Sequence, residues 1–171
     1  MLESSQGNKS ACHGQALLDD GLPAFDKLPV LYQSLVQHLH TYSCPMWLTR
    51  VGGFVRHIER GSMSPVAIQA ALGDEAGATA AALAEIAALP LAPAAQYKER
   101  TIRLFLLVHR NPIAGLLKIV ELSELLPLSI PADLRSNPGM ITDAAFAAGR
   151  LGLWTMRREL LTAAALSLIH I

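Results

Sequence analysis

Apolar residues recur along most of the chain at intervals of three and four positions, the spacing that places side chains on one face of an α-helix. The clearest case is Leu31, Leu35 and Leu39, which predict an amphipathic helix over residues 25–42. Nowhere do apolar and polar residues alternate for long enough to indicate a strand. The pattern therefore predicts an all-α fold, an irregular bundle of about six to eight helices.

Proline, glycine and serine punctuate this pattern. Further helices are expected over residues 46–60, 66–72, 79–89, 96–110, 113–126, 141–150 and 154–165, with a turn over 73–77 and a loop over 127–139. Ser64 and Pro65 suit the N-cap and the first position of a helix. Gly52 and Gly53 lie inside the helix over 46–60, where they predict either a kink or the close approach of another backbone. The extended link 89–93 contains two prolines and is the best internal boundary.

These breaks divide the chain into four parts. Residues 1–22 are polar and rich in Gly and Ser, which predicts a disordered tail. Residues 23–92 and 93–165 are expected to form an N-terminal and a second helical segment. Residues 166–171, LSLIHI, resemble the translated end of a sequencing-library adapter. We therefore expect the natural protein to continue differently after residue 165, and the second segment to be truncated at its C-terminus.

Composition bounds the function. Of 171 residues, 51% are apolar, which is enough to bury the core of an ordinary domain. Lys and Arg balance Asp and Glu at 14 each, so charge gives no argument for binding nucleic acid or an anionic membrane. No stretch is long and apolar enough to predict a membrane span, and the N-terminus lacks a secretory pattern. Cys12 and Cys44 are expected to be reduced thiols in a cytoplasmic protein.

The histidines form no recognisable catalytic or metal-binding motif. His38 and His40 are two residues apart, whereas ligand pairs on one helical face favour a spacing of three or four, and His57 could join them only through tertiary structure. Arg103 and His109 match the loose Arg-x5-His spacing of HEPN-type ribonucleases. Six residues rotate a helix by about 600°, so these two side chains should not share a face. We expect no catalytic residue, no metal site and no cofactor.

One segment resembles the first half of a helix-turn-helix, over residues 64–73. The helix that would read DNA then carries Asp74, Glu75 and Glu85 and no basic residue. An acidic helix repels phosphates and lacks the side chains that recognise base edges. A DNA-associated transcriptional regulator using residues 64–89 is therefore the alternative function, and ordinary helix packing is the simpler interpretation.

The stretch 141–161 points to a family. It contains Ile141-Thr142, Ala147-Ala148, Leu151-Gly152-Leu153 and Met156-Arg157. This order resembles, without a gap, the pattern of the HDOD domain, a helical signalling module of bacteria. Upstream, Asn111-Pro112 followed by Leu116-Leu117 resembles the Asp-Pro and double Leu of that family, although the double Leu lies nearer the proline. Glu159 departs from the family pattern, which has an apolar residue there. The resemblance covers mainly residues 111–161.

The resemblance implies a fold like that of the HD phosphohydrolases without their metal ligands, and regulation through protein contacts instead of chemistry. No His-Asp dipeptide occurs among the six histidines. We interpret Gly152 as a hinge that lets two helices approach closely, with Leu153 in the joint. Gly152, Leu153, Trp154 and Arg157 are therefore the predicted docking residues, and Arg157 belongs to a basic cluster with Arg150 and Arg158 that could contact an acidic partner. The expected partner is a protein, not nucleic acid or a membrane.

Overall fold

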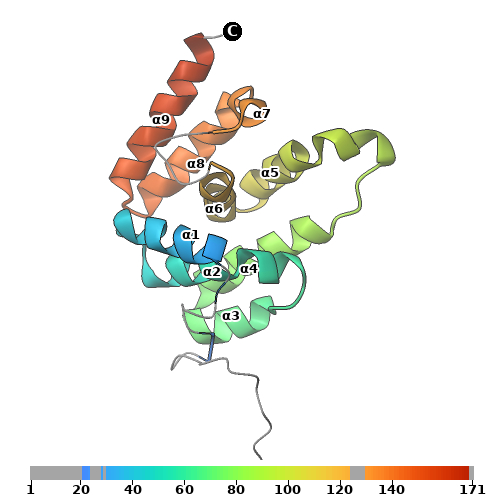
Figure 1. The fold of residues 1–171 in the computed structure, drawn as a ribbon, viewed down its shortest axis with the longest axis vertical. Helices are drawn as coiled ribbons and strands as arrows, with labels where there is room; N and C mark the ends of the chain where they lie inside the picture. Colours follow the sequence, from blue (N-terminus) through green and yellow to red (C-terminus); the bar gives the residue numbers. More distant parts are fainter. Residues whose placement is uncertain (1–20, 24–27, 29, 124–129, 170–171) are drawn as a thin grey trace, which may run out of the picture.

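The computed structural model describes residues 21–23, 28, 30–123 and 130–169, and these contain nine α-helices and one 3-10 helix but no β-strand. In chain order the helices are α1 Val30–Thr41, α2 Met46–Glu59, α3 Pro65–Leu72, α4 Asp74–Ala88, the 3-10 helix η2 Pro93–Lys98, α5 Glu99–Arg110, α6 Pro112–Leu122, α7 Ala132–Arg135, α8 Pro138–Arg150 and α9 Trp154–Ile169. Figure 1 shows α3 near one end of the molecule, α9 at the other, and α6 between them. The predicted all-α fold is confirmed. None of the described helices is both long and apolar enough to cross a lipid bilayer.

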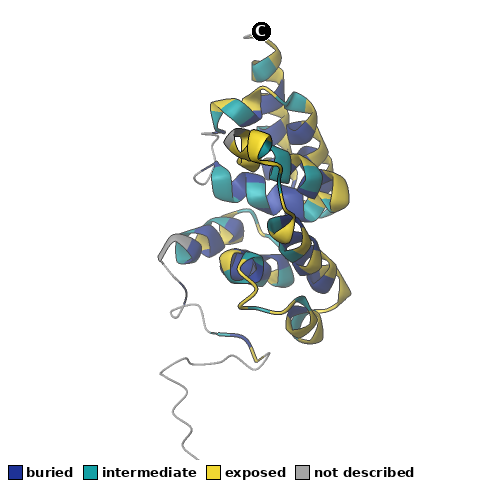
Figure 2. Ribbon diagram, turned by 90° about the vertical axis from the view of Figure 1, so that its right-hand side faces the viewer, coloured by how far each residue is buried: buried dark blue, intermediate teal, exposed yellow. Residues whose placement is uncertain are grey.

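Helix α6 lies at the centre of the core and contacts α4, α5 and α8. Its buried residues are Ala114, Gly115, Leu116, Leu117, Ile119 and Val120. One cluster of buried apolar side chains runs from Leu22 to Ala164, so the predicted segments 23–92 and 93–165 both contribute to it. Figure 2 shows the helices turning buried faces inward and exposed faces outward. The apolar positions spaced at helical intervals in the sequence therefore face the core, as expected.

The glycine pair of α2 serves close packing, and the helix runs through it without a break. A Cβ atom on Gly52 would lie 2.6 Å from Leu39 Cδ1 of α1, and one on Gly53 would lie 2.8 Å from Leu28 Cδ1. The side chains of α1 and of the residues before it occupy this space. The sequence predicted either a kink or the close approach of another backbone, and the atoms that approach these glycines are instead side-chain methyl groups.

The N-terminal boundary of the first helix differs from the prediction. Helix α1 begins at Val30 instead of residue 25, and Leu28 lies in a bend. Leu28 precedes a proline, and a residue in that position avoids the helical conformation. Residues 24–27 and 29 lie outside the described part of the chain. Of the predicted tail, only Gly21 and Leu22 are described, and Leu22 is buried.

Helix α4 begins at Asp74, whereas the sequence predicted a turn over residues 73–77. The turn is confined to Gly73, whose φ of +97° ends α3. Gly77 lies inside α4, where an added Cβ would come within 2.5 Å of Gln69 Cβ. The second glycine is thus explained by the packing of α4 on α3 and not by a turn, which periodicity alone could not show.

The expected loop over 127–139 contains more helix than predicted. Helix α7 and the start of α8 lie within it, and Pro138 occupies the first turn of α8, where a missing N–H is tolerated. Residues 124–129 lie outside the described part of the chain. The helix expected over 113–126 was predicted to end among them, so that boundary lies outside the described residues as well. Helix α9 continues to Ile169, four residues into the predicted adapter-derived stretch, and its last turn carries the exposed side chains of Leu166, Leu168 and Ile169.

We predict that replacing Gly115 with Ala destabilises the fold. An added Cβ would lie 2.7 Å from Val108 Cα, a backbone atom that moves only if α5 and α6 separate. Adding a methyl group to such a packed site should lower the free energy of unfolding by about 2 kcal/mol, within the roughly 1–3 kcal/mol range of overpacked cores. Urea unfolding followed by circular dichroism measures this change.

Gly139→Ala is the matched control. No atom lies within 4 Å of a Cβ added at Gly139, which belongs to α8 and is exposed. This substitution should leave the unfolding free energy unchanged or raise it by up to about 1 kcal/mol, since alanine restricts the unfolded chain. Equal unfolding midpoints for the two variants would contradict the close contact between α5 and α6.

Candidate functional site

Helix α8 ends in a Schellman motif at the predicted docking residues. The N–H of Gly152 donates to Gly149 O at 3.0 Å, and the N–H of Leu153 donates to Ala148 O at 2.9 Å. Gly152 has a φ of +74°, which glycine adopts without the steric cost that a Cβ would add. Leu153 is 3% exposed and fills the joint between α8 and α9, as the sequence predicted.

The interpretation of Gly152 as the point of close approach is wrong. Gly152 is exposed, and no atom lies within 4 Å of a Cβ added there. At Gly149, one turn earlier on α8, an added Cβ would lie 2.9 Å from Arg157 Cδ, so the Arg157 side chain crosses α8 there. Gly152 reverses the chain direction through its backbone conformation, and Gly149 leaves room for the Arg157 side chain.

Trp154 and Arg157 lie together on the surface of this joint. Trp154 is 65% exposed, and the Arg157 guanidinium lies 5.9 Å from the centroid of its ring, a cation–π arrangement. Arg157 also crosses Gly149, so both helices form one continuous surface. The structure therefore brings Trp154 and Arg157 together at the surface, places Leu153 beneath them, and uses Gly152 to form the turn.

Two further exposed apolar residues extend this surface along the helices. Phe146, 70% exposed, precedes Gly149 by one turn of α8, and Leu161, 37% exposed, follows Arg157 by one turn of α9. We call Phe146, Gly149, Trp154, Arg157 and Leu161 the corner surface. Sequence reasoning missed Phe146 and Leu161.

A signal for Phe146 was present in the sequence. Four alanines flank it, Ala144, Ala145, Ala147 and Ala148, and all four are buried. Helical spacing of these alanines leaves position 146 on the outer side.

The corner surface is rimmed by positive charge. Arg150, Arg157 and Arg158 are all exposed, and Asp143 is the acidic residue nearest to them along α8. None of the three arginines forms an ion pair with a residue that the structure describes. The surface therefore combines exposed aromatic area with cationic groups that can accept an acidic partner.

Glu159, the residue that departs from the HDOD pattern, joins α9 to the N-terminal helices. The Tyr42 hydroxyl donates a hydrogen bond to Glu159 Oε2. Burial, followed by this hydrogen bond, raises the pKa of Tyr42. His38 packs edge-on against the Tyr42 ring at 5.0 Å, and burial lowers the His38 pKa. A carboxylate is thus accommodated because the phenol of Tyr42, the residue that follows α1, reaches it.

The other residues considered for chemistry are not assembled. His40 is exposed, and His57 Nδ1 lies 3.2 Å from Ser62 Oγ. Within the described ranges, no three His, Cys, Asp or Glu side chains lie close enough to hold a metal ion. Arg103 and His109 line two separate hollows, so the HEPN-like spacing does not produce a site.

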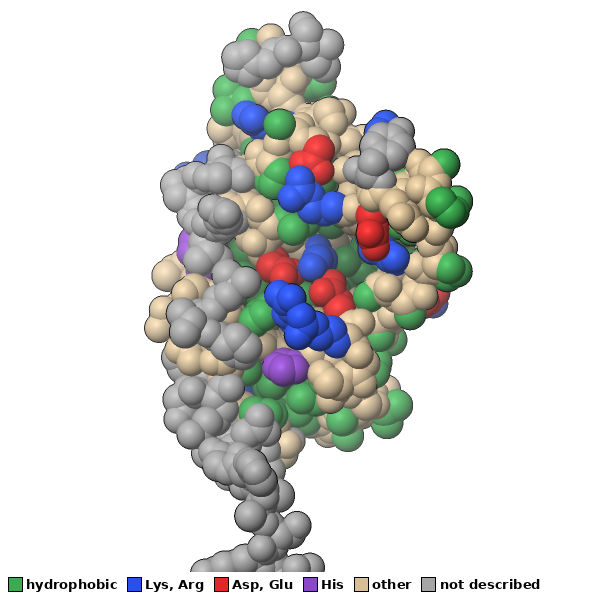
Figure 3. Space-filling view, turned by 45° about the vertical axis from the view of Figure 1, so that its right-hand side comes forward, with side chains coloured by type: hydrophobic (Ala, Val, Ile, Leu, Met, Phe, Trp, Pro, Cys, Tyr) green, Lys and Arg blue, Asp and Glu red, His purple; other side chains and the backbone are tan. Residues whose placement is uncertain are grey.

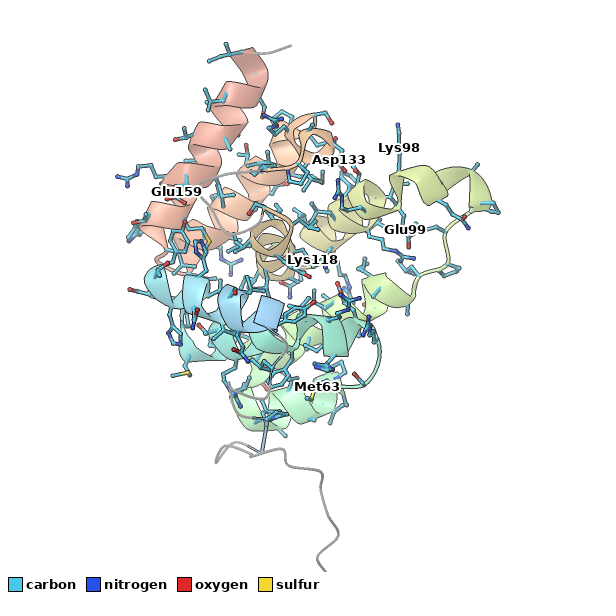
Figure 4. The ribbon with its side chains drawn as sticks, viewed as in Figure 1. Met63, Lys98, Glu99, Lys118, Asp133 and Glu159 are labelled. Atoms are coloured by element: carbon cyan, nitrogen blue, oxygen red, sulfur yellow. The ribbon has the colours of Figure 1, made fainter. Side chains whose placement is uncertain are left out.

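A charged pocket of about 600 Å³ was not anticipated from the sequence. It lies between α4 on one side and α5 and α6 on the other, and Figure 3 shows acidic and basic side chains gathered in the middle of this face. Glu99, Lys118 and Asp133 come from α5, α6 and α7 around it (Figure 4). These residues are far apart in sequence, and their spacing carried no motif.

Lys118 is the most deeply placed charge of this pocket. Its ammonium lies 3.0 Å from Glu59 Oε1 and 2.7 Å from Glu121 Oε2. Burial opposes the charge of Lys118, but the two carboxylates outweigh burial, so its pKa is raised. Glu121 also accepts a hydrogen bond from Tyr32, whose pKa is raised to about 12, mainly by burial and by Glu121.

Helices α3 and α4, which form the segment that resembles a helix-turn-helix, pack into the helical core. They are joined by Gly73 alone, and α4 buries Ala76, Ala80 and Leu83 against the rest of the protein. Its exposed residues include Asp74 and Glu85, and Glu85 forms an ion pair with an arginine of α5 at 3.2 Å. This geometry suits the simpler interpretation, in which the segment is part of the helical core.

A scan against protein-family models finds no match for the chain, and comparisons with curated proteins and with solved structures find none. The resemblance to the HDOD domain therefore stays a prediction that rests on residues 111–161.

We predict that Gly152→Ala costs about 1 kcal/mol of unfolding free energy, because an L-residue in the left-handed conformation loses roughly that amount. Gly152→Asn should lose less, since asparagine tolerates this conformation. Thermal unfolding of both variants measures the difference. An alanine variant as stable as the parent protein would mean that the Schellman turn does not constrain the joint.

The thiol of Cys44 gives a second measurable outcome. Cys44 is free and partly buried, and burial raises its pKa to about 12. Little thiolate therefore forms at pH 8.5 in the folded protein. In the Cys12→Ser variant, iodoacetamide should alkylate Cys44 at least about tenfold more slowly in the folded protein than in the protein unfolded by urea. Mass spectrometry of timed samples measures the rate. Equal rates in both conditions would show that Cys44 is open to solvent.

Proposed function

We propose that this chain is a non-enzymatic bacterial signalling module that acts in the cytoplasm by binding a partner protein at the corner surface. The observation that carries the proposal is the exposure of two large aromatic side chains, Phe146 and Trp154, at 70% and 65%. Exposed apolar area costs free energy in water and favours association. Trp and Arg, here Trp154 and Arg157, are the residue types that contribute most at protein interfaces.

The charge around the surface indicates the chemistry of the partner. Arg150, Arg157 and Arg158 surround the aromatic residues and outnumber Asp143. A complementary partner presents apolar side chains flanked by Asp or Glu. The α8–α9 pair offers a long surface along two helices, which suits an acidic amphipathic helix with anchors at spacings of three and four.

The resemblance to the HDOD domain supports the same role. Its Leu151-Gly152-Leu153 step coincides with the turn that joins α8 to α9 and sets the corner surface. The family resemblance implies regulation through protein contacts. The alternative role, a DNA-associated regulator, would rely on α4, whose exposed face carries carboxylates and would repel phosphates.

The test is selection from a displayed library of helical peptides with random surface positions. We expect the selected peptides to combine Leu, Phe or Trp at helical spacing with Asp and Glu. Trp154→Ala should weaken binding of a selected peptide by at least about tenfold, as for interface hot spots. Arg157→Gln should weaken it less in high salt than in low salt, because screening already reduces the contribution of that charge.

Phe105→Ala is the control, since Phe105 is an aromatic residue of α5 that is 57% exposed and lies outside the corner surface. This variant should bind the selected peptide like the parent protein. Selection of basic peptides, or equal losses from Phe105→Ala and Trp154→Ala, would refute the proposed surface. Retardation of duplex DNA in a gel-shift experiment at physiological salt would favour the alternative function.

A further inference from the structure

The charged pocket between α4 and α5 has the dimensions of a small-molecule site. Its volume of about 600 Å³ lies within the range of ligand-binding cavities, roughly 300–1,000 Å³. It opens where the helices before and after the link 89–93 face each other, since Leu83 and Ile86 line it from α4 and Leu104 from α5. Ligand sites occur preferentially at such junctions.

One wall of the pocket is apolar. Leu83, Ile86, Leu104, Leu107 and Leu122 line it, and all except Leu122 are buried in the core. The four buried side chains expose only 1–6% of their surface and form a closed floor, to which the half-buried Leu122 adds accessible apolar area. An aliphatic or aromatic group of moderate size can lie against this floor.

The rim of the pocket carries two immobilised guanidinium groups. Arg100 donates from Nε and Nη2 to both oxygens of Asp133, at 3.1 and 2.6 Å. Arg103 donates from Nε to Glu99 at 2.8 Å and from Nη1 to Ile86 O at 2.5 Å. These bonds fix the planes of both groups before any ligand arrives.

Each of the two guanidinium groups, of Arg100 and of Arg103, still has N–H donors that are not used by any described residue. Arg100 Nη1 and Arg103 Nη2 make no hydrogen bond to any residue within the described ranges. The lining includes the cations Lys98, Arg100, Arg103 and Lys118 and the carboxylates Glu59, Glu99 and Asp133, and Glu121 also pairs with Lys118, so the charges around the pocket balance. The spare donors of the two guanidinium groups favour an anionic group at the rim.

We propose that this pocket binds a small amphipathic organic anion, with its apolar body against Leu83, Ile86 and Leu104 and its carboxylate or phosphate at Arg103 and Arg100. The proposal is independent of the corner surface. It gives the module a means of sensing a metabolite, because a ligand held there contacts helices on both sides of the link 89–93.

The experiment compares four compounds that share an eight-carbon chain and differ in the head group: octanoate, octyl phosphate, octylammonium and octan-1-ol. Isothermal titration calorimetry on the full chain should detect binding of octanoate or octyl phosphate, and weaker or no binding of octylammonium and octanol. The ratio between the two anions then distinguishes a carboxylate from a phosphate ligand.

Variants locate the binding. Arg103→Gln should raise the Kd of the bound anion about tenfold, the effect of losing one charge-assisted hydrogen bond. Ala87→Trp should abolish binding, because Ala87 lines the pocket and a large side chain there would fill it. Arg110→Gln is the control, since Arg110 lies on the same helix and pairs with Glu85 outside the pocket, and it should leave the Kd unchanged.

The outcomes that overturn the proposal are also defined. Octylammonium binding as tightly as the anions, no binding of either anion, or equal losses from Arg103→Gln and Arg110→Gln would each reject it. Circular dichroism establishes that each variant is folded. If Arg103→Gln is not folded, Arg100→Gln provides the same test, because Arg100 is half exposed at the rim. Trp154→Ala should not affect anion binding, which separates this site from the corner surface.

Discussion

The close contact of helices at glycine positions is the constraint on which the rest of the structure depends. Gly115 of α6 lies against Val108 of α5, and Gly77 of α4 lies against Gln69 of α3. Where a Cβ is absent, the helix axes come close enough for the flanking side chains to interlock at the density of a protein interior. Because α6 contacts α4, α5 and α8, a change in its distance from α5 would also disturb its packing against α4 and α8.

The packing of the helices also determines which basic side chains pair with carboxylates and which remain exposed without an ion pair. Lys118 points from central α6 to carboxylates of α2 and of its own helix, and Arg103 binds Glu99 and a carbonyl of α4. At the joint of α8 and α9, Arg157 lies over Trp154 and forms no ion pair with a described residue. The two proposed sites therefore differ in character: a concave pocket with fixed guanidinium groups, and an exposed aromatic surface with cations.

Local sequence signals predicted the helices and several of their ends. Ser64 caps α3 by accepting a hydrogen bond from the N–H of Val66, and Asn111 caps α6 in the same way. Glycine was harder to interpret. Gly77 was predicted to lie in a turn but packs within a helix, and Gly152 was predicted to pack but forms a turn. Glycine suits both roles, and only its neighbours in space distinguish them.

The sequence by itself determined the all-α class, most of the helices and the presence of Trp154 and Arg157 at the joint of α8 and α9. These features depend on interactions within one or two helical turns, and such interactions can be read from residue spacing. Only the tertiary structure decided that the Arg157 side chain crosses Gly149, that Phe146 extends the surface and that Lys118 meets Glu59. The charged pocket belongs to this second group, because it exists only where helices distant in sequence are held at a fixed separation, and residue spacing along one helix does not record the placement of another.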